Sequence, residues 1–231
     1  MRCRRHAHGF TLVELLIALF AMSLLALMSW RGLDGMVRVQ QQTQARADEV
    51  LSLQVGLAQW VADLDALVEM PQINALDWNG RVLRLTRRGT GSVTEGVRVV
   101  GWTRRVSGGT SQWLRWQSPP LTTRGEVALA WQRADAWSKG PGDQERLDEV
   151  AVVPLADWQI FYFRDNAWTN PQSSDAMSGR VPLPIAVPPQ VGPRVVAVPD
   201  GVRLILLLPP GHAITGELVR DWARPTLGGG R

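Results

Sequence analysis

Residues 9–30 read GFTLVELLIALFAMSLLALMSW, and this stretch decides the architecture of the N-terminal part of the chain. From Phe10 to Trp30 it contains one ionisable residue, Glu14. In a helix, roughly 20 apolar residues at about 1.5 Å each are long enough to cross the hydrocarbon core of a bilayer, about 30 Å thick. We therefore predict a membrane-spanning helix over residues 10–30.

Charged residues before and within this run indicate its orientation and one anomaly. Arg2, Arg4 and Arg5 precede it, and basic residues next to a membrane segment favour keeping that end in the cytoplasm. Glu14 is the anomaly, because a carboxylate inside a membrane costs several kcal/mol and usually marks a function or a partner. A buried carboxylate needs a compensating cation, and the apolar run supplies none of its own.

Three ordinary N-terminal segments explain this pattern less well. A cleaved secretory signal has an apolar region of about 7–15 residues followed by a small-residue cleavage site, whereas this run is longer and shows no such site before Trp30. A lipoprotein signal needs its cysteine after the apolar region, but Cys3 lies before it. A plain signal anchor fits the length and charge, yet it gives no reason for Glu14.

The glycine, the phenylalanine and the glutamate five residues after the glycine resemble the class III signal of type IV pilins and type II secretion pseudopilins. The resemblance implies that residues 1–9 are a leader, cut off by a prepilin peptidase between Gly9 and Phe10 on the cytoplasmic side. It also implies methylation of the new amino group of Phe10. Glu14 would then pair in the membrane with the N-terminal amine of a neighbouring subunit during assembly.

Beyond the membrane run, we predict that the helix continues as an amphipathic periplasmic half over residues 31–70. Apolar residues recur at helical spacing from Val50 to Val68, and Pro71 cannot continue the hydrogen-bond ladder. Gly32 and Gly35 are compatible with either a hinge or a soft membrane exit.

After Pro71 the apolar period changes to two, which predicts antiparallel strands. The whole chain is thus expected to be α+β and pilin-like, with a long N-terminal helix packed on an antiparallel β-domain over residues 71–226. We predict a surface loop over residues 134–146, an irregular proline-rich loop over 170–199 and a disordered tail over 227–231. The expected strands are Arg81–Thr86, Val93–Arg105, Gln112–Gln117, Glu126–Gln132, Glu149–Leu155, Trp158–Arg164 and Val202–Leu208.

Composition argues against nucleic-acid binding. The net charge of +4 falls to 22 basic against 21 acidic residues once the three leader arginines are removed, and the other arginines are scattered. Cys3 is the only cysteine, so the exported part has no disulfide. The absence of a disulfide favours a pseudopilin, because many major pilins close a C-terminal loop with a disulfide.

No catalytic, cofactor or metal site is predicted. Of the three histidines only His212 lies outside the leader, in a turn where we expect it to be solvated. One histidine without a cysteine makes neither a catalytic triad nor a zinc cluster. An acidic cluster lacks the spacing and glycine of a calcium loop, so a solvated face is the better interpretation; it comprises Asp143, Glu145, Asp148 and Glu149.

The 11 tryptophans are expected mainly in the core and on sheet faces, with two or three at an interface. Six of them fall on predicted strands: Trp102, Trp113, Trp116, Trp131, Trp158 and Trp168.

The order of helix, β-sheet, long loop and further strands resembles the J-type minor pseudopilin of type II secretion. The local matches are Trp30–Asp34 after the membrane segment, Trp158–Asp165 with Trp168, Leu183-Pro184, and Pro199–Arg203 with the strand that follows. A proline-rich stretch separates Leu183-Pro184 from that last strand, which departs from the family pattern.

The resemblance implies a protein of the bacterial inner membrane with its C-terminal domain in the periplasm. Its partners would be the I and K types of minor pseudopilin, with the H type as a further candidate, the major pseudopilin (type G), the prepilin peptidase and the inner-membrane assembly platform. Two other functions stay open: a minor pilin of a type IV pilus or competence system, and an unprocessed, membrane-anchored periplasmic enzyme or binding domain.

Overall fold

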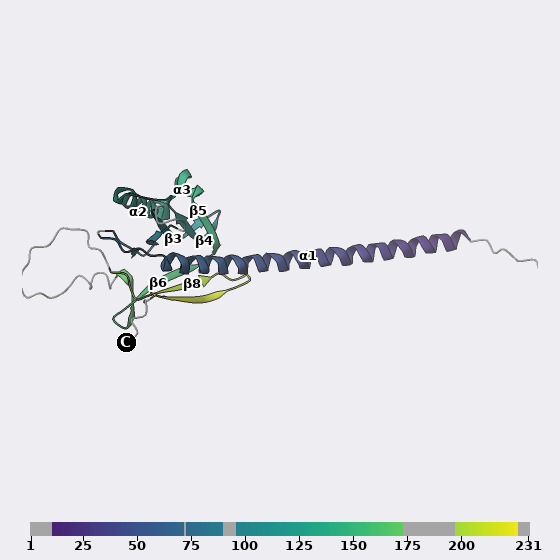
Figure 1. Ribbon diagram of the computed structural model, residues 1–231. Coiled ribbons are helices and arrows are strands. Elements are labelled where there is room, and N and C mark those ends of the chain that lie inside the picture. Colours follow the sequence, from purple (N-terminus) through teal and green to yellow (C-terminus); the bar gives the residue numbers. More distant parts are fainter. Residues whose placement is uncertain (1–10, 72, 90–95, 173–196, 226–231) are drawn as a thin grey trace, which may run out of the picture. The chain divides into compact units, whose positions relative to one another are not determined.

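The computed structural model describes residues 11–71, 73–89, 96–172 and 197–225. The fold is α+β, with a long N-terminal helix, α1 (Leu12–Asp65), followed by antiparallel sheets. The chain divides into two compact units, Met1–Asp48 and Glu49–Arg231. Helix α1 supplies the described part of the first unit and its last turns belong to the second (Figure 1).

In the first unit every described residue is exposed, including large apolar side chains such as Leu12, Phe20 and Met28. By length and composition this part of α1 could cross a membrane. Exposed apolar area of this kind is unfavourable in water and is expected to be covered by lipid or by another protein. Gly32 and Gly35 both lie inside the helix.

The second unit begins with a five-stranded antiparallel sheet in the order β1-β2-β3-β4-β5. Each strand pairs with its neighbour in sequence, and the β4–β5 pairing is interrupted by a register shift between Trp113 and Leu114. The strands are β1 (Leu76–Trp78), β2 (Val82–Arg88), β3 (Val97–Ser107), β4 (Thr110–Gln117) and β5 (Glu149–Pro154).

A four-stranded antiparallel sheet follows in the order β7-β6-β8-β9. Strand β6 lies inside the sheet, because it pairs with β7 through Phe163 and Trp168 and with β8 from Asp157 to Phe163. The strands are β6 (Asp157–Arg164), β7 (Ala167–Thr169), β8 (Gly201–Leu208) and β9 (Gly216–Ala223).

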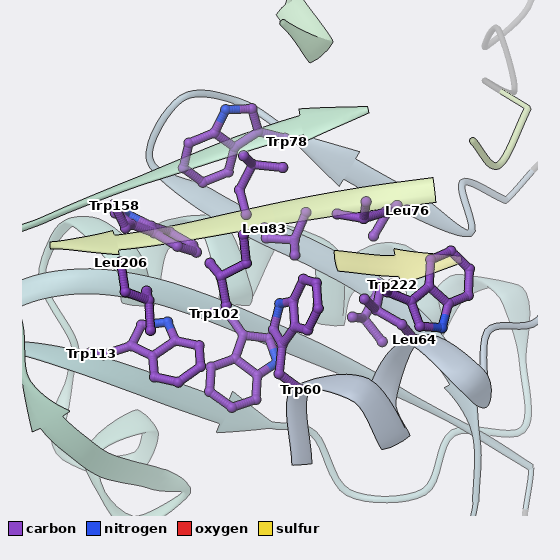
Figure 2. Close-up of a cluster of buried hydrophobic side chains, with 14 of the residues drawn as sticks. Trp60, Leu64, Leu76, Trp78, Leu83, Trp102, Trp113, Trp158, Leu206 and Trp222 are labelled. Atoms are coloured by element: carbon purple, nitrogen blue, oxygen red, sulfur yellow. The ribbon is translucent and has the colours of Figure 1, made fainter. Parts of the chain in front are cut away.

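The main hydrophobic core lies between the two sheets, with the last turns of α1 inside it (Figure 2). Leu53, Trp60 and Leu64 are its contribution from α1. Their spacing of seven and four residues keeps them on one face of the helix. They pack against inward-facing residues of both sheets, among them Trp102, Trp113, Trp158, Leu204, Leu206 and Trp222.

A second core lies under helix α2 (Arg124–Lys139), which covers the other face of the five-stranded sheet. Val127, Ala130, Ala134 and Trp137 form its buried stripe at helical spacing. The Trp137 ring lies against Gly101 of β3, where a Cβ atom would approach its Cζ3 atom to 3.1 Å. A short helix, α3 (Asp143–Leu147), joins α2 to β5.

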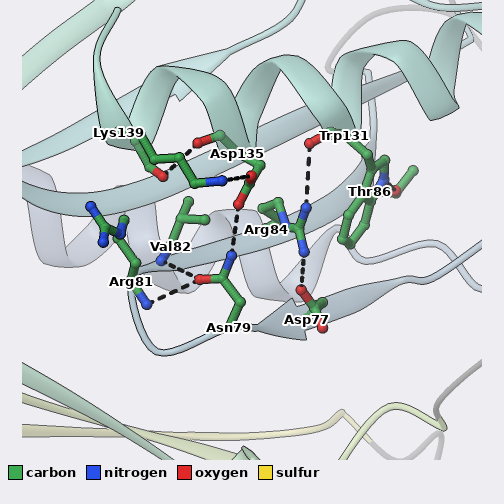
Figure 3. A network of polar contacts seen from close by, with 10 residues as sticks. Asp77, Asn79, Arg81, Val82, Arg84, Thr86, Trp131, Asp135 and Lys139 are labelled. Carbon is green, nitrogen blue, oxygen red and sulfur yellow. Dashed lines mark hydrogen bonds and ion pairs between the residues drawn. The ribbon is translucent and has the colours of Figure 1, made fainter.

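Polar contacts fix α2 against the turn between β1 and β2 (Figure 3). Asn79 donates to Asp135 of α2 at 2.8 Å, while its own side-chain oxygen accepts from the backbone N–H groups of Arg81 and Val82. Arg84 donates to the Trp131 carbonyl and forms an ion pair with Asp77. These contacts fix the position of helix α2 relative to the turn between β1 and β2.

Two sequence-based predictions are wrong in this region. The strand predicted over Glu126–Gln132 and the loop predicted over residues 134–146 are instead α2, α3 and their connection. Helix α2 begins with a capping box, in which Glu126 donates its N–H to Thr123 Oγ1 and its carboxylate accepts the Thr123 N–H. Trp131 consequently lies on a helix rather than a strand.

Six strands were predicted near their observed bounds: β2, β3, β4, β5, β6 and β8. The three short or exposed strands β1, β7 and β9 were missed. Helix α1 ends at Asp65 rather than near Glu69. Beyond it the backbone pairs with β2 instead, since Val68 donates to the Thr86 carbonyl at 3.0 Å and Arg88 donates to the Ala66 carbonyl at 2.9 Å. Most of the proline-rich loop predicted over 170–199 and the tail predicted over 227–231 lie outside the described residues.

Candidate functional site

Helix α1 starts with a second capping box, built by Thr11 and Glu14. The Glu14 Oε2 atom accepts hydrogen bonds from the Thr11 backbone N–H at 3.0 Å and from the Thr11 hydroxyl at 2.9 Å. In return, the Glu14 N–H donates to Thr11 Oγ1 at 3.3 Å. Two donors at the helix start are satisfied in this way.

This geometry gives Glu14 a local partner, Thr11, besides the N-terminal amine that the resemblance implies. The threonine three residues before a glutamate, directly ahead of an apolar run, is the signal that could have found it. The hydrogen bonds with Thr11 use only Oε2, so within the described part of the chain Oε1 can accept from a further donor. Gly9 and Phe10, the predicted cleavage and methylation positions, lie outside the described residues.

The comparison with known families supports the pilin-like signal predicted from this segment. Residues 4–30 match the family described as "Prokaryotic N-terminal methylation motif". The match includes Gly9, Phe10 and Glu14 and ends at Trp30. The motif and the long apolar helix together support placing the chain among the type IV pilin-like proteins, with the helix as a membrane anchor.

The second notable cluster surrounds Asp63, near the end of α1. Asp63 is fully buried, and both of its carboxylate oxygens accept several hydrogen bonds. Arg115 donates through Nε at 2.8 Å and through Nη2 at 2.9 Å, and Arg87 donates through Nη1 at 2.5 Å. Trp102 Nε1 and Gln59 Nε2 donate at 2.9 and 2.8 Å. The cluster connects α1 to β2, β3 and β4.

Charge within this cluster does not balance. Two guanidinium groups, on side chains that are 8% and 13% exposed, face the single carboxylate of Asp63. The Trp102 ring lies 5.8 Å from the guanidinium carbon of Arg115, and its π face attracts a cation. No local sequence pattern predicts this cluster, because its residues are far apart along the chain.

Close approach between α1 and the five-stranded sheet depends on Gly56. A Cβ atom at this position would overlap Val152 Cγ1 and lie 3.3 Å from Trp113 Cζ3. Gly56 therefore lets the helix backbone approach the register shift between β4 and β5.

His212 occupies a turn after β8, as predicted, but it is half-buried rather than fully solvated. Its Nδ1 atom lies 3.2 Å from Glu49 Oε1 on α1, and the neighbouring Ala213 N–H donates to Glu49 Oε2 at 2.7 Å.

The predicted acidic cluster includes Glu149, whose carboxylate accepts hydrogen bonds from Arg105 at 2.5 Å and from Trp137 Nε1 at 2.6 Å. Among the described residues, no three His, Cys, Asp or Glu side chains are grouped so that they could hold a metal ion.

The expected core role of the tryptophans holds for most of them. Buried tryptophans are Trp60, Trp78, Trp102, Trp113, Trp116, Trp137, Trp158 and Trp222. Trp131 and Trp168 are half-buried, and Trp30 is exposed on the first unit. An interfacial role for two or three tryptophans stays a prediction.

Proposed function

We propose that this chain is a minor pseudopilin of a type II secretion system. It would belong to the tip complex that primes assembly of the pseudopilus for export of folded proteins across the outer membrane. The observation that carries the proposal is the methylation motif at residues 4–30, which is followed along α1 by helical turns that pack inside a β-domain. In this proposal the helix anchors the protein in the inner membrane and the β-domain is periplasmic.

The J type is favoured over other minor pseudopilins by two resembling segments. Trp158–Asp165 and Pro199–Arg203 are far apart in the sequence, and the fold brings them together. The first contains β6 and the second leads into β8, and these two strands are hydrogen-bonded neighbours. Trp168, which completes the first of these matches, lies on β7 beside Phe163, with ring centroids 5.2 Å apart. These two resembling segments thus meet in the four-stranded sheet.

The proposed mechanism is assembly rather than catalysis. A prepilin peptidase would cut between Gly9 and Phe10 and methylate Phe10. The Glu14 carboxylate, whose contacts with Thr11 use only Oε2, would then bind the N-terminal amine of a neighbouring subunit in the membrane. Pairing of this kind compensates the cost of a buried carboxylate.

Partners in this proposal are the I and K types of minor pseudopilin, with the H type as a further candidate, and the major pseudopilin. The test is co-expression of the tagged full-length chain with the I and K types from the same genome, followed by purification in detergent. Stoichiometric recovery of both is expected. Recovery instead of the minor pilins of a type IV pilus or competence system would overturn the secretion role.

A Glu14→Ala variant is the matched control for that purification. It should still bind the I and K types through the β-domain if that domain carries the contacts. Processing at Gly9 must be verified in both proteins, because an unprocessed chain would indicate a plain membrane-anchored enzyme or binding domain.

A further inference from the structure

A groove runs between α1 and β5, the last strand of the five-stranded sheet. It encloses about 300 Å³. Ser52, Val55 and Gly56 of α1 line one wall and Val150–Val152 of β5 line the other, while Trp102 and Arg115 lie at its base. Val55 and Val150 are 67% and 58% exposed, so apolar side chains face solvent at its rim.

Strand β5 offers a free edge beside this groove. It pairs only with β4 in the described sheet, so one row of its backbone N–H and C=O groups is not used by sheet pairing. Such an edge can accept a further strand from another polypeptide. Charged residues or proline usually protect an exposed edge, and β5 has Pro154 at its end but valine and alanine at its centre.

The charge at the base of the groove indicates what kind of strand fits. Arg115 lines the groove while it shares Asp63 with Arg87, so the cluster carries one more positive charge than negative. The hydrogen bonds from Arg115 use Nε and Nη2, and the Nη1 group takes no part in them. A carboxylate placed beside Arg115 would balance the charge in a partly desolvated site.

We propose that this groove binds an extended, acidic segment of a partner protein, which adds to the sheet along β5. An aliphatic side chain of the segment packs against Val55 and Val150, and an acidic side chain two residues away accepts from Arg115. This binding site does not depend on the proposed role in secretion or on processing of the N-terminus.

The probe is the fluorescein-labelled peptide Gly-Thr-Val-Thr-Glu-Thr-Val-Gly, in which both valines lie two residues from the glutamate and share its strand face. It is titrated with the full-length protein in detergent micelles and followed by anisotropy. The control peptide has glutamine in place of glutamate. The acidic peptide should bind about tenfold more tightly than the control, and this preference should weaken at high salt. Equal affinity for both peptides, or no binding of either up to about 1 mM, would overturn the proposal.

Val150 provides a substitution that tests the charge argument without removing Arg115. Its register partner on β4 is Arg115, so a side chain at position 150 lies on the same face beside the guanidinium. Val150→Asp should supply the missing negative charge within the chain and reduce binding of the acidic peptide at least about tenfold. Val150→Asn, of the same shape but uncharged, should keep the preference for the acidic peptide.

Val219→Asp on β9 is the positional control, because Val219 is also an exposed strand residue (48%) but lies on the other sheet. It should leave binding unchanged. If Val150→Asp binds the acidic peptide as well as the unmodified protein does, or if Val219→Asp weakens binding equally, the groove is not the binding site.

Discussion

Arg115 of β4 donates two hydrogen bonds to the buried carboxylate of Asp63 on α1, from Nε to Oδ2 at 2.8 Å and from Nη2 to Oδ1 at 2.9 Å. The pair joins a helix residue to a strand residue 52 positions later in the chain. Arg87 adds a second guanidinium to the same carboxylate. The register of α1 against the five-stranded sheet is therefore fixed by charge as well as by apolar packing.

Replacing Asp63 with asparagine should be strongly destabilising. The substitution leaves Arg87 and Arg115 buried without an anion, and removing one partner from a buried ion pair typically costs about 3–5 kcal/mol. The free energy of unfolding, measured in urea on the full-length protein in micelles, checks this value. Asp65→Asn is the control, because Asp65 is exposed and the side-chain oxygen of asparagine can still accept from Trp222 Nε1. Its loss should therefore be at most about 1 kcal/mol. Equal losses in the two variants would refute the importance of the Asp63 cluster.

Gly56→Ala tests the close approach of α1 to β5. The new methyl group would overlap Val152, whose branched side chain has little rotamer freedom, so we expect a loss of about 1–3 kcal/mol. Removing the obstacle with Val152→Ala should restore part of this loss in the double variant. Thermal unfolding of the two single variants and the double variant gives the coupling energy, and purely additive effects would contradict the predicted contact.

How far the sequence could predict these features depends on the range of the interaction. The apolar run to Trp30 and the alternation in β2, β4 and β6 are local patterns, and they predicted the helix and most strands. Asp63 and Arg115 meet only through the tertiary fold, so no local pattern marks them as partners.

Helix α2 is a different case, because its signals were local and were overlooked. Thr123 and Glu126 have capping-box spacing, and Val127, Ala130 and Ala134 recur at helical spacing. The valine and tryptophan content favoured a strand, and packing on the second core decided for a helix. The missed strand β9 is mostly exposed and carries three charged residues among its eight, which hides the alternation.

Asp135 should make the stability of the β-domain depend on pH. The hydrogen bond from Lys139 lowers the pKa of the Asp135 carboxyl below its usual value, against a smaller opposing effect of burial. A group whose pKa is lower in the folded state contributes stability above its unfolded pKa, about 3.9, and loses it as pH falls through the folded value. Asp135→Asn should therefore lower the melting temperature at pH 7 and have a much smaller effect near pH 2.

The measurement is a series of thermal unfolding curves for the Asp135→Asn variant and the unmodified protein between pH 7 and pH 2. Because the ion pair with Lys139 is partly exposed, the difference at pH 7 should stay below about 1 kcal/mol. A difference that is constant across this range would show that the charge on Asp135 does not contribute.

Glu14 can be tested for two separate roles, capping of α1 and charge pairing with a partner. Glutamine can keep the capping box with Thr11 but carries no charge, whereas alanine removes both. If pairing with an N-terminal amine drives assembly, Glu14→Gln and Glu14→Ala should both weaken assembly while the β-domain keeps its unmodified melting temperature. Normal secretion by Glu14→Ala, with cleavage intact, would remove the assembly role.

The most direct test of the account is the mass of the N-terminal peptide of the protein extracted from membranes of cells with active prepilin peptidase. We expect a peptide that begins at Phe10 and carries one methyl group on its amino terminus, with residues 1–9 absent. A peptide that still begins at Met1 in those cells would contradict it.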